Sequence, residues 1–159
     1  MKKLFTILLL LTSLVLSSNT ATAQSTQANA KKVRPTLNHV ALYVVDLKKS
    51  TYFYQYVLEL DSIADPFHDE RHTWFSIGPL SHLHLIQGAK DFSLHPKNSH
   101  LCFTVPSVQD FIKTLDAHQI TYENLAGEKM QVTKRVDGVF QIYFNDPDGY
   151  WIEINDAKY

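Results

Sequence analysis

Residues 143–155 of the chain read YFNDPDGYWIEIN. Two apolar runs flank an Asp-Pro-Asp-Gly turn, and these residue types suit the tight backbone angles of a β-hairpin. Because side chains alternate across a strand, Ile152 and Ile154 share one face of the second strand and Glu153 lies on the other. A carboxylate in mid-strand needs a partner if its face is enclosed. On this stretch alone, a Glu153 that faces water on an edge strand is the simpler explanation.

Outward from this hairpin, the chain repeats one order of elements. A strand, a helix and three more strands are predicted in a first module, 37–90, and again in a second module, 98–156. The first strands of the two modules carry His39 and His100, which are 61 residues apart. The sequence therefore predicts an α+β fold of two βαβββ modules in a single domain, 37–156. An accidental similarity of two small α+β units is the alternative.

The elements within each module follow from local patterns. Asp46 and Ser107 suit the N-caps of the two helices, and apolar residues recur at helical spacing after each of them. Residues 127–138 form a polar connection. Strands are predicted at 37–45, 62–64, 72–77, 81–87, 100–105 and 120–124, with a final pair between 139 and 153.

Four polar residues occupy equivalent places in the two modules. His39 and His100 lie in the first strands, and His84 and Glu153 lie in the fourth strands, in each case opposite an apolar stripe. Imidazole and carboxylate groups are ligands for divalent first-row metals. The repetition favours a lined cavity over an isolated edge-strand carboxylate at Glu153, and it predicts a metal site.

Other polar and aromatic residues have simpler interpretations. Cys102 lies beside His100, where we expect a small buried hydrophobe rather than a ligand. His82 shares a strand face with His84 and is an alternative ligand, and Lys134 and Arg135 either contact an anionic substrate or face water. Histidines in loop and helix-end contexts are expected to be solvated: His68, His72, His95 and His118. Aromatic residues that could line a pocket or pack in the core are Tyr43, Trp74, Tyr143 and Trp151.

Four segments resemble the vicinal oxygen chelate superfamily, which includes glyoxalase I, extradiol dioxygenases, fosfomycin-resistance proteins and bleomycin-binding proteins. The segments are NHVAL at 38–42, LHL at 83–85, SHLCF at 99–103 and FNDPDGYWIE at 144–153, of which the last is the most specific. The resemblance covers about Leu37 to Asn155. It implies that the paired modules form a curved, cup-shaped mixed sheet.

The resemblance also implies a ligand set. His39, His100 and Glu153 match metal-ligand positions of the superfamily, and His84 stands where several members have Glu or Gln. The implied cofactor is a divalent metal ion (Zn, Ni, Mn, Co or Fe(II)), and the implied partner is a small-molecule substrate with two adjacent oxygens. Relatives often build the site across a subunit boundary, so a homodimer is expected. The sequence leaves open whether His39 and Glu153 meet within one chain or across two.

Three activities are compatible with this set. The first is a lyase or isomerase of glyoxalase type, in which Glu153 is both ligand and base. The second is an extradiol-type dioxygenase with Fe(II), which a ligand at His84 disfavours because it fills an open position. The third is a bleomycin-type binding protein without catalysis. The retained ligand candidates favour an enzyme.

The first 36 residues are not expected to belong to the fold. Met1-Lys2-Lys3 and the apolar run that follows predict a signal peptide over 1–23, with small residues at its end, and 24–36 read as a disordered spacer. No cysteine lies near the predicted cleavage site, so a lipid anchor is not expected. We therefore expect an exported protein, periplasmic or secreted, with little access to the cytoplasmic thiols on which glyoxalase I depends.

Composition excludes some classes of partner. The formal net charge is −1, which gives no reason to expect binding to nucleic acid or, after signal cleavage, to an anionic membrane. The single cysteine rules out an intrachain disulfide.

Overall fold

The computed structural model describes residues 33–158, so the predicted signal peptide and most of the predicted spacer lie outside the described residues. The unit that contains both modules starts at Pro35. No helix in the described range is long and apolar enough to cross a membrane.

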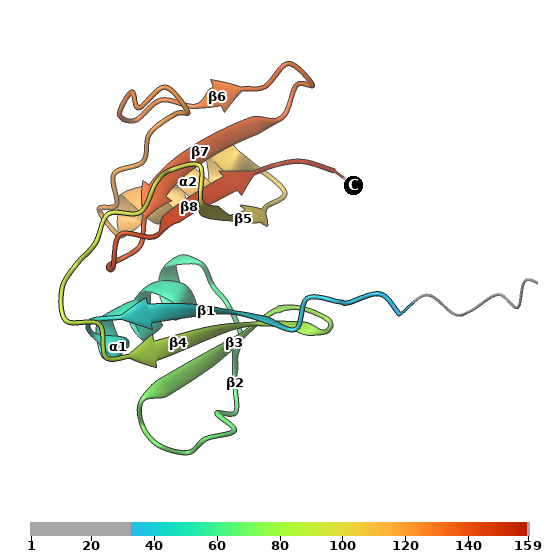
Figure 1. Ribbon diagram of the computed structural model, residues 1–159. Coiled ribbons are helices and arrows are strands. Elements are labelled where there is room, and N and C mark those ends of the chain that lie inside the picture. Colours follow the sequence, from blue (N-terminus) through green and yellow to red (C-terminus); the bar gives the residue numbers. More distant parts are fainter. Residues whose placement is uncertain (1–32, 159) are drawn as a thin grey trace, which may run out of the picture. The chain divides into compact units, whose positions relative to one another are not determined.

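The first module forms a four-stranded mixed sheet (Figure 1). Its elements are β1 (His39–Val44), α1 (Leu47–Tyr52), a π-helical turn η1 (Phe53–Val57), β2 (Ser62–Ile63), β3 (His72–Gly78) and β4 (Ser81–Gln87). The strand order is β1-β4-β3-β2, with β1 and β4 parallel and the other pairs antiparallel. The parallel pair sets His39 beside His82 and Ala41 beside His84.

The second module repeats this topology. Its elements are β5 (His100–Thr104), α2 (Val108–Ala117), β6 (Thr133–Lys134), β7 (Phe140–Asn145) and β8 (Trp151–Asn155). The order is β5-β8-β7-β6, again with the first pair parallel. The predicted α+β fold of two βαβββ modules is therefore confirmed, as two open four-stranded sheets.

One predicted strand, 120–124, is wrong. Within it only Glu123 makes bridges, to Lys129 and Tyr143, and the strand next to β7 is instead β6. The Asn124 side chain explains the difference, because its Oδ1 accepts a hydrogen bond from the Glu128 amide at 2.9 Å and turns the chain.

The two predicted helix caps are confirmed. Asp46 accepts a hydrogen bond from the Lys49 amide at 3.1 Å, and Ser107 accepts one from the Asp110 amide at 3.1 Å. Each side chain pairs a backbone N–H that the first helical turn leaves without a partner. These caps fix where α1 and α2 begin, just after the first strand of each module.

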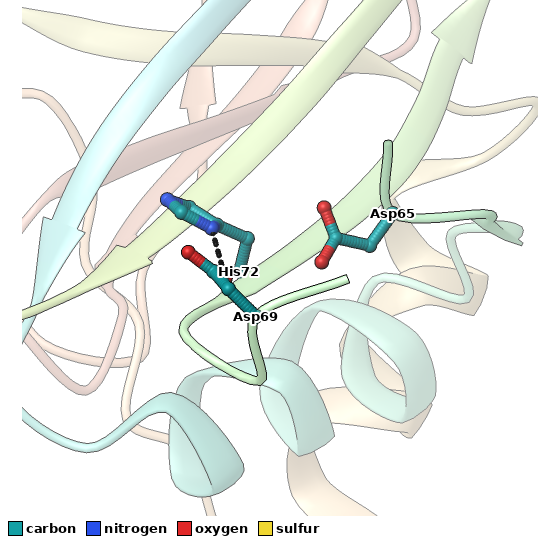
Figure 2. A group of neighbouring side chains, drawn as sticks. All are labelled: Asp65, Asp69 and His72. Carbon is teal, nitrogen blue, oxygen red and sulfur yellow. Dashed lines mark hydrogen bonds and ion pairs between the residues drawn. The ribbon is translucent and has the colours of Figure 1, made fainter. Parts of the chain in front are cut away.

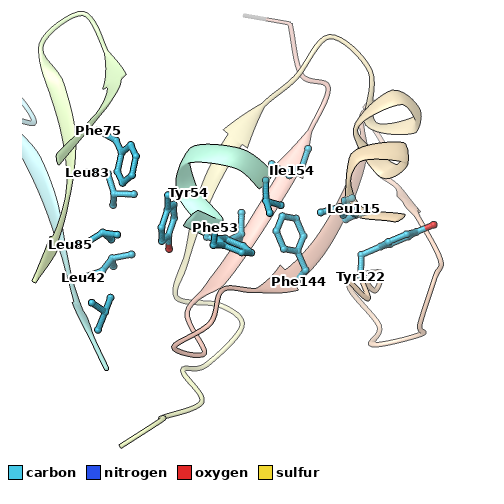
Figure 3. Close-up of a cluster of buried hydrophobic side chains, with 14 of the residues drawn as sticks. Leu42, Phe53, Tyr54, Phe75, Leu83, Leu85, Leu115, Tyr122, Phe144 and Ile154 are labelled. Carbon is cyan, nitrogen blue, oxygen red and sulfur yellow. The ribbon is translucent and has the colours of Figure 1, made fainter. Parts of the chain in front are cut away.

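Both sheets contribute their apolar faces to one hydrophobic core (Figure 3). Phe53 and Tyr54 of η1 lie between the sheets. The Tyr54 ring is 6.2 Å from that of Phe75 in the first sheet, and the Phe53 ring is 6.2 Å from that of Phe144 in the second. Because side chains alternate across a strand, the opposite face of each sheet points away from this core. We call these opposite faces the mixed faces.

The Asp146–Gly149 turn of the second module is tied to the first module. Tyr54 donates a hydrogen bond from its hydroxyl to Asp146 at 2.7 Å, and Asp148 accepts hydrogen bonds from the Ser50 hydroxyl at 2.5 Å and the Val45 amide at 2.7 Å. Burial raises the pKa of Asp146 to about 6, although the hydrogen bonds that it accepts act in the opposite direction.

Gly149 closes the turn in a left-handed conformation, with φ of +88°. A Cβ there would lie 2.4 Å from the Ser93 carbonyl oxygen, so this position requires glycine.

Candidate functional site

The first half of the predicted ligand set, His39 and His84, lies on the mixed face of the first sheet. The two imidazole centroids are 5.9 Å apart. His39 is exposed at the start of β1, and its Nδ1 is 2.7 Å from Asn38 Oδ1, so its Nε2 remains available as a ligand. We call His39 and His84 the first half-site.

His84 is far more enclosed than His39. Only 5% of its surface is exposed, its ring stacks on Trp74 at 3.9 Å, and Phe67 covers it at 5.8 Å. Burial, then the neighbouring His72 and His39, hold the pKa of His84 below its usual value, so the ring is neutral at pH 7 and keeps a lone pair. Its Nε2 is buried and has no hydrogen-bond partner among the described residues.

The second half of the set, His100 and Glu153, lies on the mixed face of the second sheet. His100 Nε2 is 3.2 Å from Glu153 Oε2, and His100 Nδ1 is held 2.7 Å from the Lys97 carbonyl oxygen. This distance suits two neighbouring ligands, because bonds of about 2 Å at tetrahedral angles place ligand atoms about 3.3 Å apart. We call His100 and Glu153 the second half-site.

Glu153 is 6% exposed and surrounded by donors. Tyr143 donates its hydroxyl to Oε2 at 2.6 Å, and Asn155 donates its side-chain amide to Oε1 at 3.0 Å. Burial alone would raise the pKa of Glu153, but these hydrogen bonds, one from Cys102 and the nearby His100 outweigh it and hold the pKa below its usual value. The carboxylate is therefore ionised, as a metal ligand or a base must be.

Cys102 contributes its thiol to this group rather than a thiolate. Loss of hydration and the adjacent Glu153 carboxylate raise the pKa of Cys102 to about 12, so the group is a neutral thiol at pH 7. The expectation that Cys102 is buried is wrong, because it lies exposed on the mixed face. Strand alternation gives the face on which Cys102 lies, but it does not tell whether other parts of the same chain cover that face.

The two half-sites do not converge within one chain. Within residues 33–158, one group of at least three His, Cys, Asp or Glu residues has its ligand atoms within 4.8 Å of one another. None of the four predicted ligands belongs to that group. The shared core explains this, since both apolar faces turn inward and the mixed faces turn outward. The four-ligand site therefore stays a prediction, and one chain supplies it as two separate halves.

The group that the structure does bring together is Asp65, Asp69 and His72 (Figure 2). His72 was expected to be solvated, but its side chain is only 13% exposed, and its Nδ1 is 2.6 Å from Asp69 Oδ1. Its ring lies 4.7 Å from Phe67 and 4.9 Å from His84. Strand alternation could have identified it, because His72 and Trp74 have the same parity in β3 and Trp74 pairs with His84.

Other predicted residues have structural partners. His82 lies 6.2 Å from Trp74, the His95 ring stacks on Tyr150 at 3.9 Å, and the Trp151 indole donates to the His95 carbonyl oxygen at 2.8 Å. Lys134 lies over the Phe140 ring at 5.6 Å, and Arg135 pairs with Asp137 at 2.6 Å.

Comparison with known proteins gives one family. The model of the Glyoxalase/Bleomycin resistance protein/Dioxygenase superfamily matches residues 36–154. A lactoylglutathione lyase from Pseudomonas putida is 27% identical, over 86% of this chain and 93% of its own length. "Glyoxylase I 4" of Arabidopsis thaliana is 30% identical, over 74% of this chain and 68% of its own length.

Solved structures agree with this match in fold. The crystal structure of a genomically encoded fosfomycin resistance protein from Listeria monocytogenes superposes with a TM-score of 0.63 at 23% identity, covering 79% of this chain and 96% of its own.

Proposed function

The chain belongs to the Glyoxalase/Bleomycin resistance protein/Dioxygenase superfamily, and we propose that it is an exported, metal-dependent enzyme of glyoxalase type. The proposed reaction is a proton transfer, of lyase or isomerase type, on a small substrate with two adjacent oxygens. The observation that carries it is the second half-site, where a buried, ionised Glu153 lies 3.2 Å from His100.

The residues present fit a divalent metal ion. His39 and His100 each have Nδ1 engaged by an acceptor, at Asn38 and at the Lys97 carbonyl, so Nε2 is the ligand nitrogen in both rings, and in His100 it faces Glu153 Oε2 at 3.2 Å. Such outer hydrogen bonds orient metal-binding histidines. With Glu153 they supply two nitrogens and one carboxylate, and His84 is the fourth candidate. When bound, the ion supplies Lewis-acid polarisation of the substrate oxygens.

We propose that the site is completed by a second copy of the chain. The half-sites lie on mixed faces that point away from the shared core, so a twofold contact can set the first half-site of one copy against the second half-site of the other. Each homodimer then contains two identical sites.

Within such a site, Glu153 is the proposed base. Tyr143 and Asn155 hold one oxygen each, so the carboxylate is fixed in orientation and stays ionised before it takes a proton from the carbon beside the substrate carbonyl. Trp74 and Trp151 border the two half-sites and offer apolar walls.

Dioxygenase chemistry is the second candidate. His84 is enclosed by Trp74 and Phe67, whereas His39 is exposed on the same face. A set of His39, His100 and Glu153 alone is the two-histidine, one-carboxylate arrangement of non-haem Fe(II) oxygenases.

Glu153→Gln tests the proposed role, with Glu128→Gln as the control at an exposed carboxylate. The metal-loaded protein is screened with α-oxo acids, hydroxycarbonyls, catechols and lactoylglutathione. Turnover of the substrate found should fall by about 10²-fold or more in Glu153→Gln, because a general base contributes typically 10²–10⁴-fold. Unchanged turnover with metal still bound would exclude Glu153 as the base. If the protein only sequesters a ligand, Glu153→Gln leaves affinity within a few-fold and Trp74→Ala lowers it.

Mixing two inactive variants tests the shared site. His39→Gln and Glu153→Gln chains, refolded together, form mixed dimers in which one of two composite sites is intact, so about one quarter of wild-type activity should return. If each site is instead built within one chain, every site in the mixture carries one of the two substitutions, and the mixture stays inactive.

Export is tested separately. We propose cleavage after residue 23, and mass spectrometry of the protein from the extracytoplasmic fraction should give a chain that starts at Gln24. Recovery of the intact chain in the cytoplasmic fraction would refute it.

A further inference from the structure

The loop ahead of β3 gathers metal-binding side chains that the proposed composite site does not use. Asp65, Asp69 and His72 each place a ligand atom within 4.8 Å of the other two, as Figure 2 shows for the loop and the first residue of β3. Donor atoms bound to one ion by bonds of about 2.1 Å are separated by at most about 4.2 Å, so small side-chain movements suffice. Exposed carboxylates often gather without an ion, and this group alone is not a site.

A second observation comes from the adjacent strand. His84 is 95% buried, and its Nε2 has no hydrogen-bond partner among the described residues. Its ring lies 4.9 Å from the His72 ring, while Trp74 stacks on it and Phe67 covers it. A buried nitrogen without a partner is destabilising by about 1–3 kcal/mol, so a native structure rarely keeps one without a reason.

The surroundings of His84 indicate which partner is missing. Phe67 has no polar group, and the Trp74 indole Nε1, although a donor, is itself buried without a partner among the described residues and does not bond to His84. The ring beside His84, His72, is held by Asp69 at 2.6 Å. His84 is not one of the residues whose ligand atoms lie within 4.8 Å of one another, so the loop that carries Asp65 and Asp69 has to move toward it. After such a movement, one cation could bond to both imidazoles and be neutralised by the carboxylates.

We propose that the first module binds a divalent transition-metal ion by itself, through His72, His84 and the carboxylates of Asp65 and Asp69. Two imidazoles and two carboxylates suit Zn, Ni, Co or Mn rather than Ca or Mg, which prefer oxygen ligands throughout. A neutral imidazole has one ring-nitrogen lone pair and binds one ion, so the composite site keeps His39, His100 and Glu153. The first-module site exists within one chain and does not depend on the proposed reaction.

Metal stoichiometry separates the two sites without any activity assay. The probe is Zn²⁺ or Ni²⁺ alone, titrated into the full chain by calorimetry and counted by elemental analysis after desalting. The wild type should hold two ions per chain. His72→Gln and Asp65→Asn should each lose one ion or weaken its binding more than tenfold, while the control His68→Gln, at an exposed neighbouring histidine, changes nothing. Glu153→Gln should keep the first-module ion and lose or weaken the other.

Tryptophan emission localises the first-module ion. In a Trp151→Phe, His39→Gln background, Trp74 is the only remaining tryptophan, and it stacks on His84 at 3.9 Å. The His39→Gln change removes a ligand of the composite-site ion, which would otherwise quench Trp74 too because the His39 ring is 5.3 Å from it. Ni²⁺ should quench its emission, and His72→Gln in the same background should abolish the quenching. If His72→Gln destabilises the fold, as far-UV circular dichroism would reveal, Asp69→Asn on the exposed loop replaces it. This proposal would be overturned if the wild type, Asp65→Asn and His72→Gln (or its replacement Asp69→Asn) bound metal with the same stoichiometry and affinity, and metal left Trp74 emission unchanged. That result would not bear on the composite site.

Discussion

The hydroxyl of Tyr54 stabilises a buried carboxylate of the other module, and Tyr54→Phe measures that interaction. Tyr54 is fully buried and donates to Asp146 Oδ2 at 2.7 Å. At pH 8 Asp146 is ionised, because its pKa is about 6. Loss of a hydrogen bond to a charged group should lower the free energy of unfolding by about 1.5–3 kcal/mol. At pH 5 Asp146 is protonated, and the loss should be about 1 kcal/mol, as for a neutral pair.

The sign follows from linkage. Burial raises the pKa of Asp146 in the folded state from 3.8 to about 6, so the folded state binds this proton more tightly than the unfolded state does. The proton's contribution to stability is therefore complete below about pH 4 and is lost as pH rises to about 6, an effect of about 3 kcal/mol for two pH units. Tyr54→Phe removes the hydrogen bond from Tyr54 that lowers the pKa of Asp146. The loss of unfolding free energy caused by Tyr54→Phe must therefore grow as pH rises.

The assay is urea denaturation at pH 5 and pH 8, at constant ionic strength and followed by tryptophan fluorescence. Tyr122→Phe is the matched control, because Tyr122 donates at 3.4 Å to the carbonyl oxygen of Met130, which does not titrate. The control should lose at most about 1 kcal/mol, equally at both pH values. A Tyr54→Phe loss that is the same at pH 5 and pH 8 would refute the assignment of Asp146 as the titrating partner.

Three further predictions concern the core, a helix cap and metal. Leu115→Ala in α2 should lower the free energy of unfolding by about 2–5 kcal/mol, because Leu115 is fully buried, whereas Leu80→Ala at a 75% exposed side chain should stay within about 0.5 kcal/mol. Ser107→Ala should cost about 0.5–2 kcal/mol through the lost N-cap bond, and Ser107→Asp should not; equal losses in both, by urea denaturation, would contradict a capping role. A chelator should lower Tm, and Zn, Ni, Mn, Co or Fe(II) should restore it, since a hundredfold excess over Kd stabilises by about 2.7 kcal/mol. No shift in Tm with any metal would refute metal binding.

Local patterns predicted the modules well because each signal is complete within a few residues. The alternation of Ile152, Glu153 and Ile154 gave the faces of β8, and Asp46 and Ser107 gave the helix starts. The internal repeat identified the equivalent positions of His39 and His100.

Features that depend on distant packing were missed. The sequence offers no local signal that both apolar faces pack on η1 and leave the half-sites pointing outward, because this depends on contacts such as Phe53 with Phe144. His72 was assigned to solvent because its ring contact with His84 comes from a neighbouring strand, although strand alternation would have placed it on the same face as Trp74. Strand 120–124 failed for a related reason, since only Glu123 finds a pairing partner on β7.

The position of η1 between the two sheets has a consequence for how the repeat could be divided. A polypeptide that stopped near residue 90 would retain Phe53 and Tyr54 but expose them, because Phe144 and Asp146 belong to the other half. The complementary fragment would in turn leave one side of its sheet bare to water. Neither half is therefore expected to be an autonomous folding unit, although each has the full topology of one. Two separately expressed halves should be recovered in soluble form only when they are produced together, as a reconstituted pair.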